Sequence, residues 1–385
     1  MTVTARSRTD SAVHGGTSVE IKVIDTDVHV EPRSFDELVP YLPPEWRDRN
    51  VLDRVPYSRA TYRTLDGGGR KDSYNERGEI GSDPDLVGRQ LFVDDPIDYA
   101  ILLPWSFRGF TVDPHLDTAL AGAVNAWLAD TWLGAYNAEN RYVGSISVSV
   151  DDPLGAAREI EKWAGHPGYR QVMIGHYGPR PYGHPMYDPI WEAAARHSLP
   201  IAVHFRGGAT QPLGWTSTAT LQYFVEYHSL IAPMAYEAHM VSWICNGVLD
   251  RHPAMKVLFV EGGFLWYRPL IDRLGRHWAR TGAELAARRT PEEYVRDNFR
   301  WASQPIEEAT NPRQIANLFE EANARELLMF SSDYPHYDYD PPSRALPRGL
   351  DEETRWRILS ENAREVYGLP KTRPADRYDS AAVTK

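Results

Sequence analysis

Short apolar strands and helical segments alternate eight times along this chain, and the alternation narrows the folds that it can adopt. Each expected strand is a short run rich in Val, Ile and Leu, and a longer helical segment follows it. The expected strands cover residues 23–31, 99–103, 143–150, 171–175, 200–205, 256–261, 298–302 and 327–331. Regular alternation is typical of a parallel sheet with helices on its outside. Eight such units predict an α/β fold, a (β/α)8 TIM barrel.

Three segments stand outside this alternation. Residues 33–91 make a long insertion after the first strand, rich in Pro, Arg, Asp and Gly and without clear periodicity. Connections of this length are often functional lids or pocket walls, and the alternative is a plain surface insertion. Residues 1–18 and 371–385 are polar, so we expect a disordered N-terminal arm and a flexible C-terminal tail. The barrel domain is then expected over residues 19–370.

Charge and cysteine content exclude several classes of partner. The chain has 42 basic and 53 acidic residues, and a net charge of −11 argues against nucleic acids and anionic membranes. A small-molecule substrate is the better expectation. The one cysteine, Cys245, permits neither an internal disulfide nor a zinc site built from thiolates. No apolar run approaches the roughly 20 residues that cross a bilayer, and no signal-peptide core is present, so we expect a cytoplasmic protein.

The first strand carries three potential metal ligands. Asp27, His29 and Glu31 alternate with small or β-branched residues, so a strand's period of two points their side chains to one side. The neighbouring Val and Ile residues indicate that this strand is buried. Because buried carboxylates need a cation or a hydrogen-bond donor, the motif predicts a polar centre inside the fold.

Further ligand-type residues lie at the ends of three other strands. They are His204 at the end of the fifth strand, Glu261 at the end of the sixth and Asp333 at the end of the eighth. Alone, each has an ordinary structural explanation, but the chemistry of such barrels gathers at the carboxyl ends of the strands. Together with the first strand they predict a shared metal site of His and carboxylate ligands, suited to Zn, Mn or Fe. The number of carboxylates leaves one or two divalent ions open.

Two more histidines are candidates with a plain alternative. His228 lies at the start of an expected helix over residues 224–249, where it either serves as an acid, base or metal ligand or faces solvent. His336 follows Asp333 by three residues. It either contacts substrate or a second metal, or it is a turn residue held by the preceding proline.

The motifs together resemble the amidohydrolase-related family, the branch of the amidohydrolase superfamily that includes aminocarboxymuconate-semialdehyde decarboxylase. The resemblance covers roughly residues 24–369 and rests on IDTDVHVEP (24–32), IAVH (201–204), GVLDRHPAMKVLFVEGG (247–263) and SSDYPH (331–336). It implies a metal-dependent TIM barrel, often dimeric, with Asp27, His29, His204 and Asp333 as ligands. Two departures stand out: the family's usual His-x-His begins with Asp27 here, and Glu261 replaces the usual strand-six histidine.

These features support three functional hypotheses. The first is a metal-dependent hydrolase of an ester, thioester, amide or activated C–C bond, in which Asp333 or Glu261 accepts a proton from the attacking water. The second is a non-oxidative decarboxylase of an aromatic or unsaturated acid, with His228 standing in for the missing histidine. Glu261 places hydrolysis first. The third is a barrel that binds a ligand without catalysis.

Overall fold

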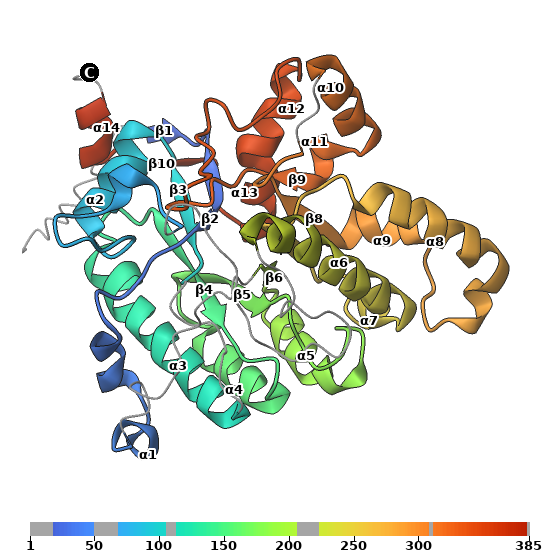
Figure 1. Ribbon diagram of the computed structural model, residues 1–385, viewed down its shortest axis with the longest axis horizontal. Coiled ribbons are helices and arrows are strands. Elements are labelled where there is room, and N and C mark those ends of the chain that lie inside the picture. Colours follow the sequence, from blue (N-terminus) through green and yellow to red (C-terminus); the bar gives the residue numbers. More distant parts are fainter. Residues whose placement is uncertain (1–17, 50–67, 105–112, 206–222, 308–310, 383–385) are drawn as a thin grey trace, which may run out of the picture.

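A parallel barrel forms the centre of the computed structural model, which describes residues 18–49, 68–104, 113–205, 223–307 and 311–382. Eight strands, β2 to β9, form one sheet in which each strand pairs with the next along the chain. The sheet closes where the Thr26 N–H donates to the Phe330 carbonyl at 3.0 Å and Val28 bridges Tyr334. Figure 1 shows the strands in the middle with helices outside them. The predicted (β/α)8 barrel is therefore confirmed.

Some of the barrel strands stop before the residues expected to carry the chemistry. The strands are β2 (Ile24–Val28), β3 (Tyr99–Leu102), β4 (Tyr142–Ser147), β5 (Tyr169–Gly175), β6 (Ile201–His204), β7 (Val257–Val260), β8 (Phe299–Ala302) and β9 (Leu328–Met329). Glu261 and Asp333 therefore lie beyond β7 and β9. Both have a left-handed backbone, with φ of 56° and 57°, which cannot continue a strand.

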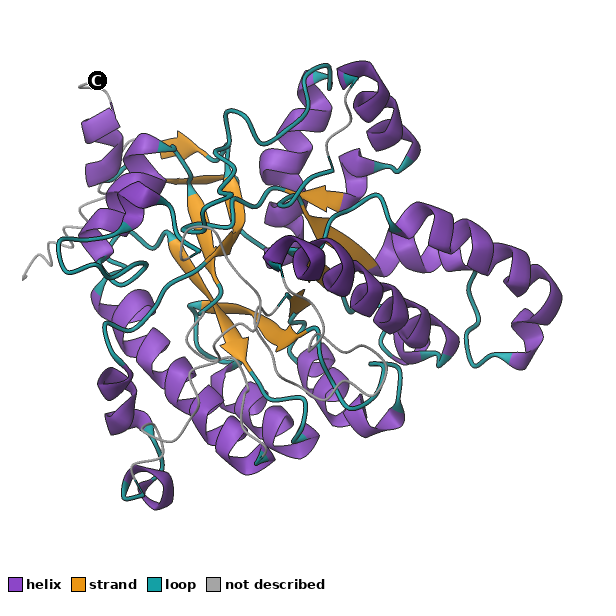
Figure 2. Ribbon diagram, in the orientation of Figure 1, coloured by secondary structure: helices purple, strands orange, loops and turns teal. Residues whose placement is uncertain are grey.

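Helices surround the barrel (Figure 2). They are α1 (Pro44–Arg47), α2 (Pro84–Arg89), α3 (Pro114–Asp130), α4 (Pro153–Trp163), α5 (Asp188–Arg196), α6 (Phe224–Cys245), α7 (Val248–Arg251), α8 (Tyr267–Thr281), α9 (Pro291–Asn298), α10 (Pro312–Glu321), α11 (Ala324–Leu327), α12 (Glu352–Trp356), α13 (Asn362–Tyr367) and α14 (Arg377–Ala382). The single helix expected over 224–249 is two, because Gly247 turns with φ of +65° between α6 and α7. A Cβ at Gly247 would lie 2.8 Å from the Ala286 carbonyl oxygen, so the turn requires glycine.

Strand periodicity points the polar side chains at the strand ends into the barrel. In β6, Ile201 and Val203 pack into the core between strands and helices, whereas Ala202 packs into the separate core inside the barrel. His204 lies two residues after Ala202 and points the same way. In β2, the polar side chains also point into the barrel, because the pairing register with β3 shifts between Asp25 and Val28.

The C-terminal segment is ordered, and the prediction of a flexible tail over 371–385 was wrong for residues 372–382. β10 (Thr372–Pro374) pairs antiparallel with β1 (Ser18–Glu20), and α14 follows it beside α2 (Figure 1). The polar composition misled because it includes ion-pair partners for buried arginines. Arg141, 1% exposed, donates to Asp376 at 2.7 Å and to Asp379 at 3.1 Å. Residues 1–17 of the expected arm and 383–385 of the tail lie outside the described residues.

The insertion over 33–91 is described at residues 33–49 and 68–91. It contains α1, α2, a 3₁₀ helix at Phe35–Tyr41 and a short 3₁₀ turn at Lys71–Ser73, and a π-helical turn at Gln90–Asp94 follows α2. Among the described residues, no helix combines the length and apolar character that crossing a membrane requires.

Candidate metal centre

Four of the predicted ligands meet at the carboxyl end of the barrel. Asp27, His29 and His204 each place a ligand atom within 4.8 Å of the others, and a second, overlapping group joins His29 with Asp333 and His336. The His29 Nε2 lies 3.2 Å from Asp27 Oδ1 and 3.1 Å from Asp333 Oδ1, and His204 Nε2 lies 3.5 Å from Asp27 Oδ1. All four side chains are buried. We call Asp27, His29, His204 and Asp333 the ligand set.

His29 is oriented by the neighbouring strand. Its Nδ1 donates to the Leu103 carbonyl at 2.8 Å, so Nε2 faces the carboxylates. Burial lowers the pKa of His29, but Asp27 and Asp333 outweigh it and raise the pKa to about 9. A cation that binds Nε2 therefore displaces a proton. His204 behaves oppositely, because burial and then the charge of His29 hold its pKa well below the usual value and keep the imidazole in its neutral, metal-binding form.

The ligand set contains buried polar atoms without a hydrogen-bond partner among the described residues. They are both carboxylate oxygens of Asp27, the Nε2 of His204 and the Oδ2 of Asp333. Each unsatisfied buried group costs about 1–3 kcal/mol. One divalent cation would satisfy all of them, and two imidazoles with two carboxylates are donors that Zn, Mn and Fe accept. The residues present therefore fit a divalent metal.

Asp25 holds the residue before Asp333 in place, and the sequence did not predict this role. The Ser332 N–H donates to Asp25 Oδ1 at 2.9 Å, and the Ser332 hydroxyl donates to Asp25 Oδ2. The Tyr334 N–H in turn donates to the Ser332 hydroxyl at 3.1 Å. Burial raises the pKa of Asp25 to about 8. The available signal was its spacing, because Asp25 precedes Asp27 by the same two residues that separate Asp27 from His29.

Glu261 and His228 form a second pair beside the ligand set. His228 Nε2 lies 3.3 Å from Glu261 Oε1, and Glu261 Oε2 lies 3.6 Å from His204 Nε2. Burial lowers the pKa of His228 to about 4, so its imidazole is neutral at pH 7. His228 sits in the first half of α6 with its ring edge against Phe205. Glu261 belongs to neither group of converging ligand atoms among the described residues.

His336 and Glu31 differ in where the structure places them. His336 Nδ1 lies 2.6 Å from Asp333 Oδ1, so it is part of the centre. Glu31 belongs to neither ligand group among the described residues, and it is partly exposed. β2 ends at Val28, so His29 directly follows the strand, whereas Glu31 lies three residues beyond its end, where strand periodicity no longer directs the side chain. Its backbone N–H donates to the Gly81 carbonyl at 2.9 Å.

Comparison with known proteins places this geometry in a family. The amidohydrolase family matches residues 24–369, which is most of the chain. The chain belongs to the amidohydrolase family. The residues that match the family include all four residues of the ligand set.

Solved structures with the same fold include several decarboxylases. An amidohydrolase from Mycobacterium avium subsp. paratuberculosis K-10 is 21% identical with a TM-score of 0.63, over 91% of this chain and 98% of that one. The 5-carboxyvanillate decarboxylase of Sphingomonas paucimobilis is 20% identical with a TM-score of 0.64, over 91% and 100%. A dihydroxybenzoic acid decarboxylase from Polaromonas sp. JS666, with bound manganese and the inhibitor 2-nitroresorcinol, is 18% identical with a TM-score of 0.61, over 91% and 97%. At these identities the likeness establishes a shared fold.

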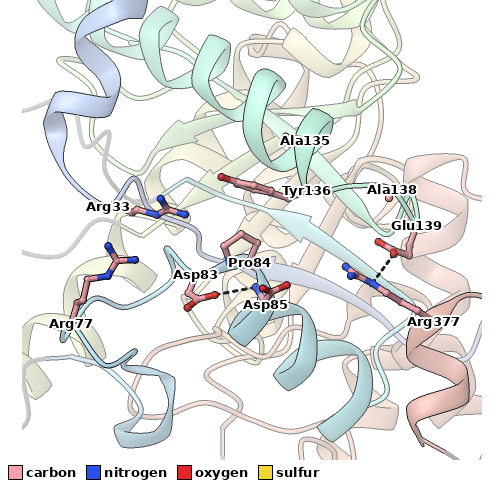
Figure 3. Close-up of a pocket in the computed structure, with 10 residues that line it drawn as sticks. All are labelled: Arg33, Arg77, Asp83, Pro84, Asp85, Ala135, Tyr136, Ala138, Glu139 and Arg377. Atoms are coloured by element: carbon pink, nitrogen blue, oxygen red, sulfur yellow. Dashed lines mark hydrogen bonds and ion pairs between the residues drawn. The ribbon is translucent and has the colours of Figure 1, made fainter.

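A polar pocket of about 530 Å³ lies away from the metal centre of this amidohydrolase (Figure 3). It lies between the insertion, α14 and the segment after α3, and none of its lining residues belongs to the ligand set. Several of its charges are already engaged: Arg377 pairs with Glu139 at 2.7 Å, and Asp83 caps α2 by accepting from the N–H groups of Asp85 and Leu86. The pocket therefore adds nothing to the candidate centre.

Proposed function

We propose that this amidohydrolase is a metal-dependent, non-oxidative decarboxylase of an aromatic or unsaturated carboxylic acid. The observation that carries the proposal is the engagement of Asp333. Its Oδ1 is shared by His29 Nε2 at 3.1 Å and His336 Nδ1 at 2.6 Å, and its buried Oδ2 has no hydrogen-bond partner among the described residues, so a cation would occupy it. An aspartate in this position is a poor acceptor for the proton of an attacking water, which hydrolysis needs and decarboxylation does not.

The similarly folded proteins give separate support. Several are decarboxylases of hydroxylated aromatic acids, and three of these structures contain manganese. A divalent cation held by the ligand set would bind the substrate's oxygens and stabilise the negative charge that develops as CO₂ leaves. We infer from these two lines that decarboxylation, the second hypothesis from the sequence, ranks above hydrolysis.

The chain's own residues would supply the proton that replaces CO₂. The C–C bond to the carboxylate breaks, its electron pair stays on the substrate carbon, and that carbon then takes up a proton. His228 and Glu261, 3.3 Å apart, form a pair that can hold and deliver one. The neutral imidazole of His228 can release a proton from one nitrogen while it accepts one on the other. The two side chains are only 13% and 6% exposed, which limits the access of bulk water to the transfer.

Hydrolysis remains the second candidate because of one observation. Glu261 Oε2 lies 3.6 Å from His204 Nε2, close enough to the ligand set to accept a proton from water there. An ester, a thioester such as an acyl-CoA, an amide or an activated C–C bond would be the substrate. A homodimer, a cytoplasmic location and the role of Glu31 as a ligand stay predictions.

The test is a substrate screen of the Mn²⁺-loaded protein in D₂O. Hydroxybenzoic and related unsaturated acids form one arm, and p-nitrophenyl esters and acyl-CoA thioesters form the other. We expect release of CO₂ and a product with one deuterium at the vacated carbon. Metal-dependent cleavage of esters or thioesters, with no CO₂ from any acid, would instead assign the protein as a hydrolase.

A further inference from the structure

The insertion runs directly along the loop that carries Asp333. The Arg70 N–H donates to the Pro335 carbonyl at 2.8 Å, and the Tyr337 N–H donates to the Gly68 carbonyl at 3.1 Å. Between these two bonds, Gly69 and His336 form an antiparallel bridge. Backbone hydrogen bonds on both sides of His336 therefore attach the insertion to the loop that follows Asp333.

A buried side-chain network reinforces this pairing. The Tyr334 hydroxyl donates to Gln90 Oε1 at 2.7 Å, and the Ser73 hydroxyl donates to the same oxygen at 3.0 Å. The Gln90 amide donates in turn to the Asp72 carbonyl at 2.8 Å. Gln90 is 3% exposed and Tyr334 is fully buried. Since every member has a partner, the network holds its geometry rigidly, and it ends on the residue next to Asp333.

Arg70 holds the far side of the same loop. Its guanidinium lies 4.1 Å from the centre of the Tyr339 ring and 3.8 Å from an Asp95 oxygen. The Tyr339 hydroxyl donates to Asp95 at 2.7 Å. Cation–π contact and ion pairing together attach the loop beyond His336 to the insertion and to the turn after α2.

The insertion also reaches the first strand's ligands. The Glu31 N–H donates to the Gly81 carbonyl at 2.9 Å, two residues after His29. Gly81 has φ of +67°, and a Cβ there would lie 3.2 Å from the His29 carbonyl oxygen. The close approach requires glycine. The insertion thus contacts the backbone beside ligands from both the first and the eighth strand.

The geometry points to residues 68–90 as a brace of the metal centre, with Gln90 as a positioning residue that acts through the Tyr334 hydroxyl on Asp333. This inference deepens the proposed function, because it concerns how the same ligand set is held, but it does not depend on which reaction the centre performs. It favours a functional role for the insertion over a plain surface insertion.

The experiment compares Gln90→Leu, Tyr334→Phe and the double variant by Mn²⁺ affinity and by hydrogen exchange of residues 331–340. Loss of a group hydrogen-bonded to a metal ligand weakens binding by roughly 10–100-fold, and this contact acts one residue further out, so we expect a loss of up to about tenfold for each single variant. Because Tyr334→Phe breaks a contact that Gln90→Leu also breaks, the double variant should bind no more weakly than Gln90→Leu. Gln90→Glu keeps the acceptor for Tyr334 and should restore most of the affinity. Exchange in 331–340 should speed up in Gln90→Leu and Tyr334→Phe.

Asp83→Ala is the matched control, because it removes the cap of α2 within the same insertion and none of the contacts to the Asp333 loop. It should lower the melting temperature and leave Mn²⁺ affinity and exchange of residues 331–340 unchanged. Equal effects in the control and in Gln90→Leu would overturn the brace, as would unchanged affinity and exchange in Gln90→Leu and Tyr334→Phe. If the wild type binds no Mn²⁺, the metal centre of the proposed function fails, and hydrogen exchange by itself then decides the brace.

Discussion

His29 Nδ1 donates to the carbonyl oxygen of Leu103 across 2.8 Å, and this single bond decides which ring nitrogen faces the centre. Leu103 directly follows β3 and His29 directly follows β2, so the end of one strand orients the imidazole at the end of its neighbour. With Nδ1 engaged, Nε2 is directed at Asp27 and Asp333. An oriented imidazole between two buried carboxylates is a preformed binding arrangement, since little has to move when a cation replaces the proton.

Replacing Asp333 by Asn tests this arrangement. The amide keeps the shape of the side chain but loses the charge that complements the cation and His29. We expect Mn²⁺ affinity, measured by isothermal titration calorimetry, to fall by more than the roughly 10–100-fold that the loss of an outer partner costs. Asp272→Asn, an exposed change on α8, serves as the control and should bind as the wild type does. Wild-type affinity in Asp333→Asn would remove this residue from the ligand set.

Metal content in Glu261→Gln separates one ion from two. Glu261 lies outside both groups of converging ligand atoms among the described residues, so we expect close to one Mn²⁺ per chain in wild type and variant alike. The turnover rate should fall by about 10²–10⁴-fold with little change in KM, because the variant loses a proton-transfer group. Two ions in wild type and one in the variant would show that Glu261 is a ligand of a binuclear centre.

The convergence of Asp27, His29, His204 and Asp333 was predictable because its signals are local. Asp27 and His29 are two residues apart at the end of one apolar segment, and His204 and Asp333 lie at or just after the ends of two others, so strand periodicity and the barrel rule were enough to bring them together. Glu31 marks the limit of this reasoning. The period of two ends where β2 ends, at Val28, and the sequence does not show that boundary.

The parts that sequence reasoning missed depend on contacts between distant segments. Asp25 meets Ser332 across 307 positions, and Gln90 meets Tyr334 across 244. In neither pair does a sequence motif or a periodicity at one residue predict contact with the other. The ordered C-terminal segment was missed for the same reason. The polar composition of residues 371–385 is typical of a solvent-exposed segment, and the sequence does not show that Arg141 is buried opposite them.

Removing residues 371–385 should therefore destabilise the protein. The deletion leaves Arg141, 1% exposed, and Asp98, 6% exposed, without their charged partners Asp379 and Arg373. Breaking a buried ion pair in this way costs roughly 3–5 kcal/mol. The measurement is the urea midpoint by circular dichroism, which should fall. Deleting residues 383–385 alone spares all these contacts and should leave the midpoint in place. An unchanged midpoint in the longer deletion would show that the ion pairs add nothing to stability.

His239 should make the fold sensitive to acid. It is fully buried, accepting from the Tyr182 N–H at 3.1 Å through Nδ1 and donating to the His176 carbonyl at 2.9 Å through Nε2. Burial lowers its pKa from 6.5 to about 4. The imidazole therefore takes up a proton near pH 6.5 in the unfolded chain but only near pH 4 in the folded chain. The contribution of His239 to the free energy of unfolding is thus fully present above pH 6.5 and is lost as the pH falls from 6.5 to 4.

The loss attributable to His239 is about 3 kcal/mol between pH 7 and pH 4, at 1.36 kcal/mol per unit of pKa. His239→Gln keeps one acceptor and one donor but cannot take up a proton. Its free energy of unfolding should be lower than that of the wild type at pH 7, yet it should decline less steeply toward pH 4. His277→Gln, at an exposed position on α8, should retain the wild-type slope. Urea titrations at several pH values measure both, and parallel pH profiles for wild type and His239→Gln would mean that other groups cause the acid sensitivity.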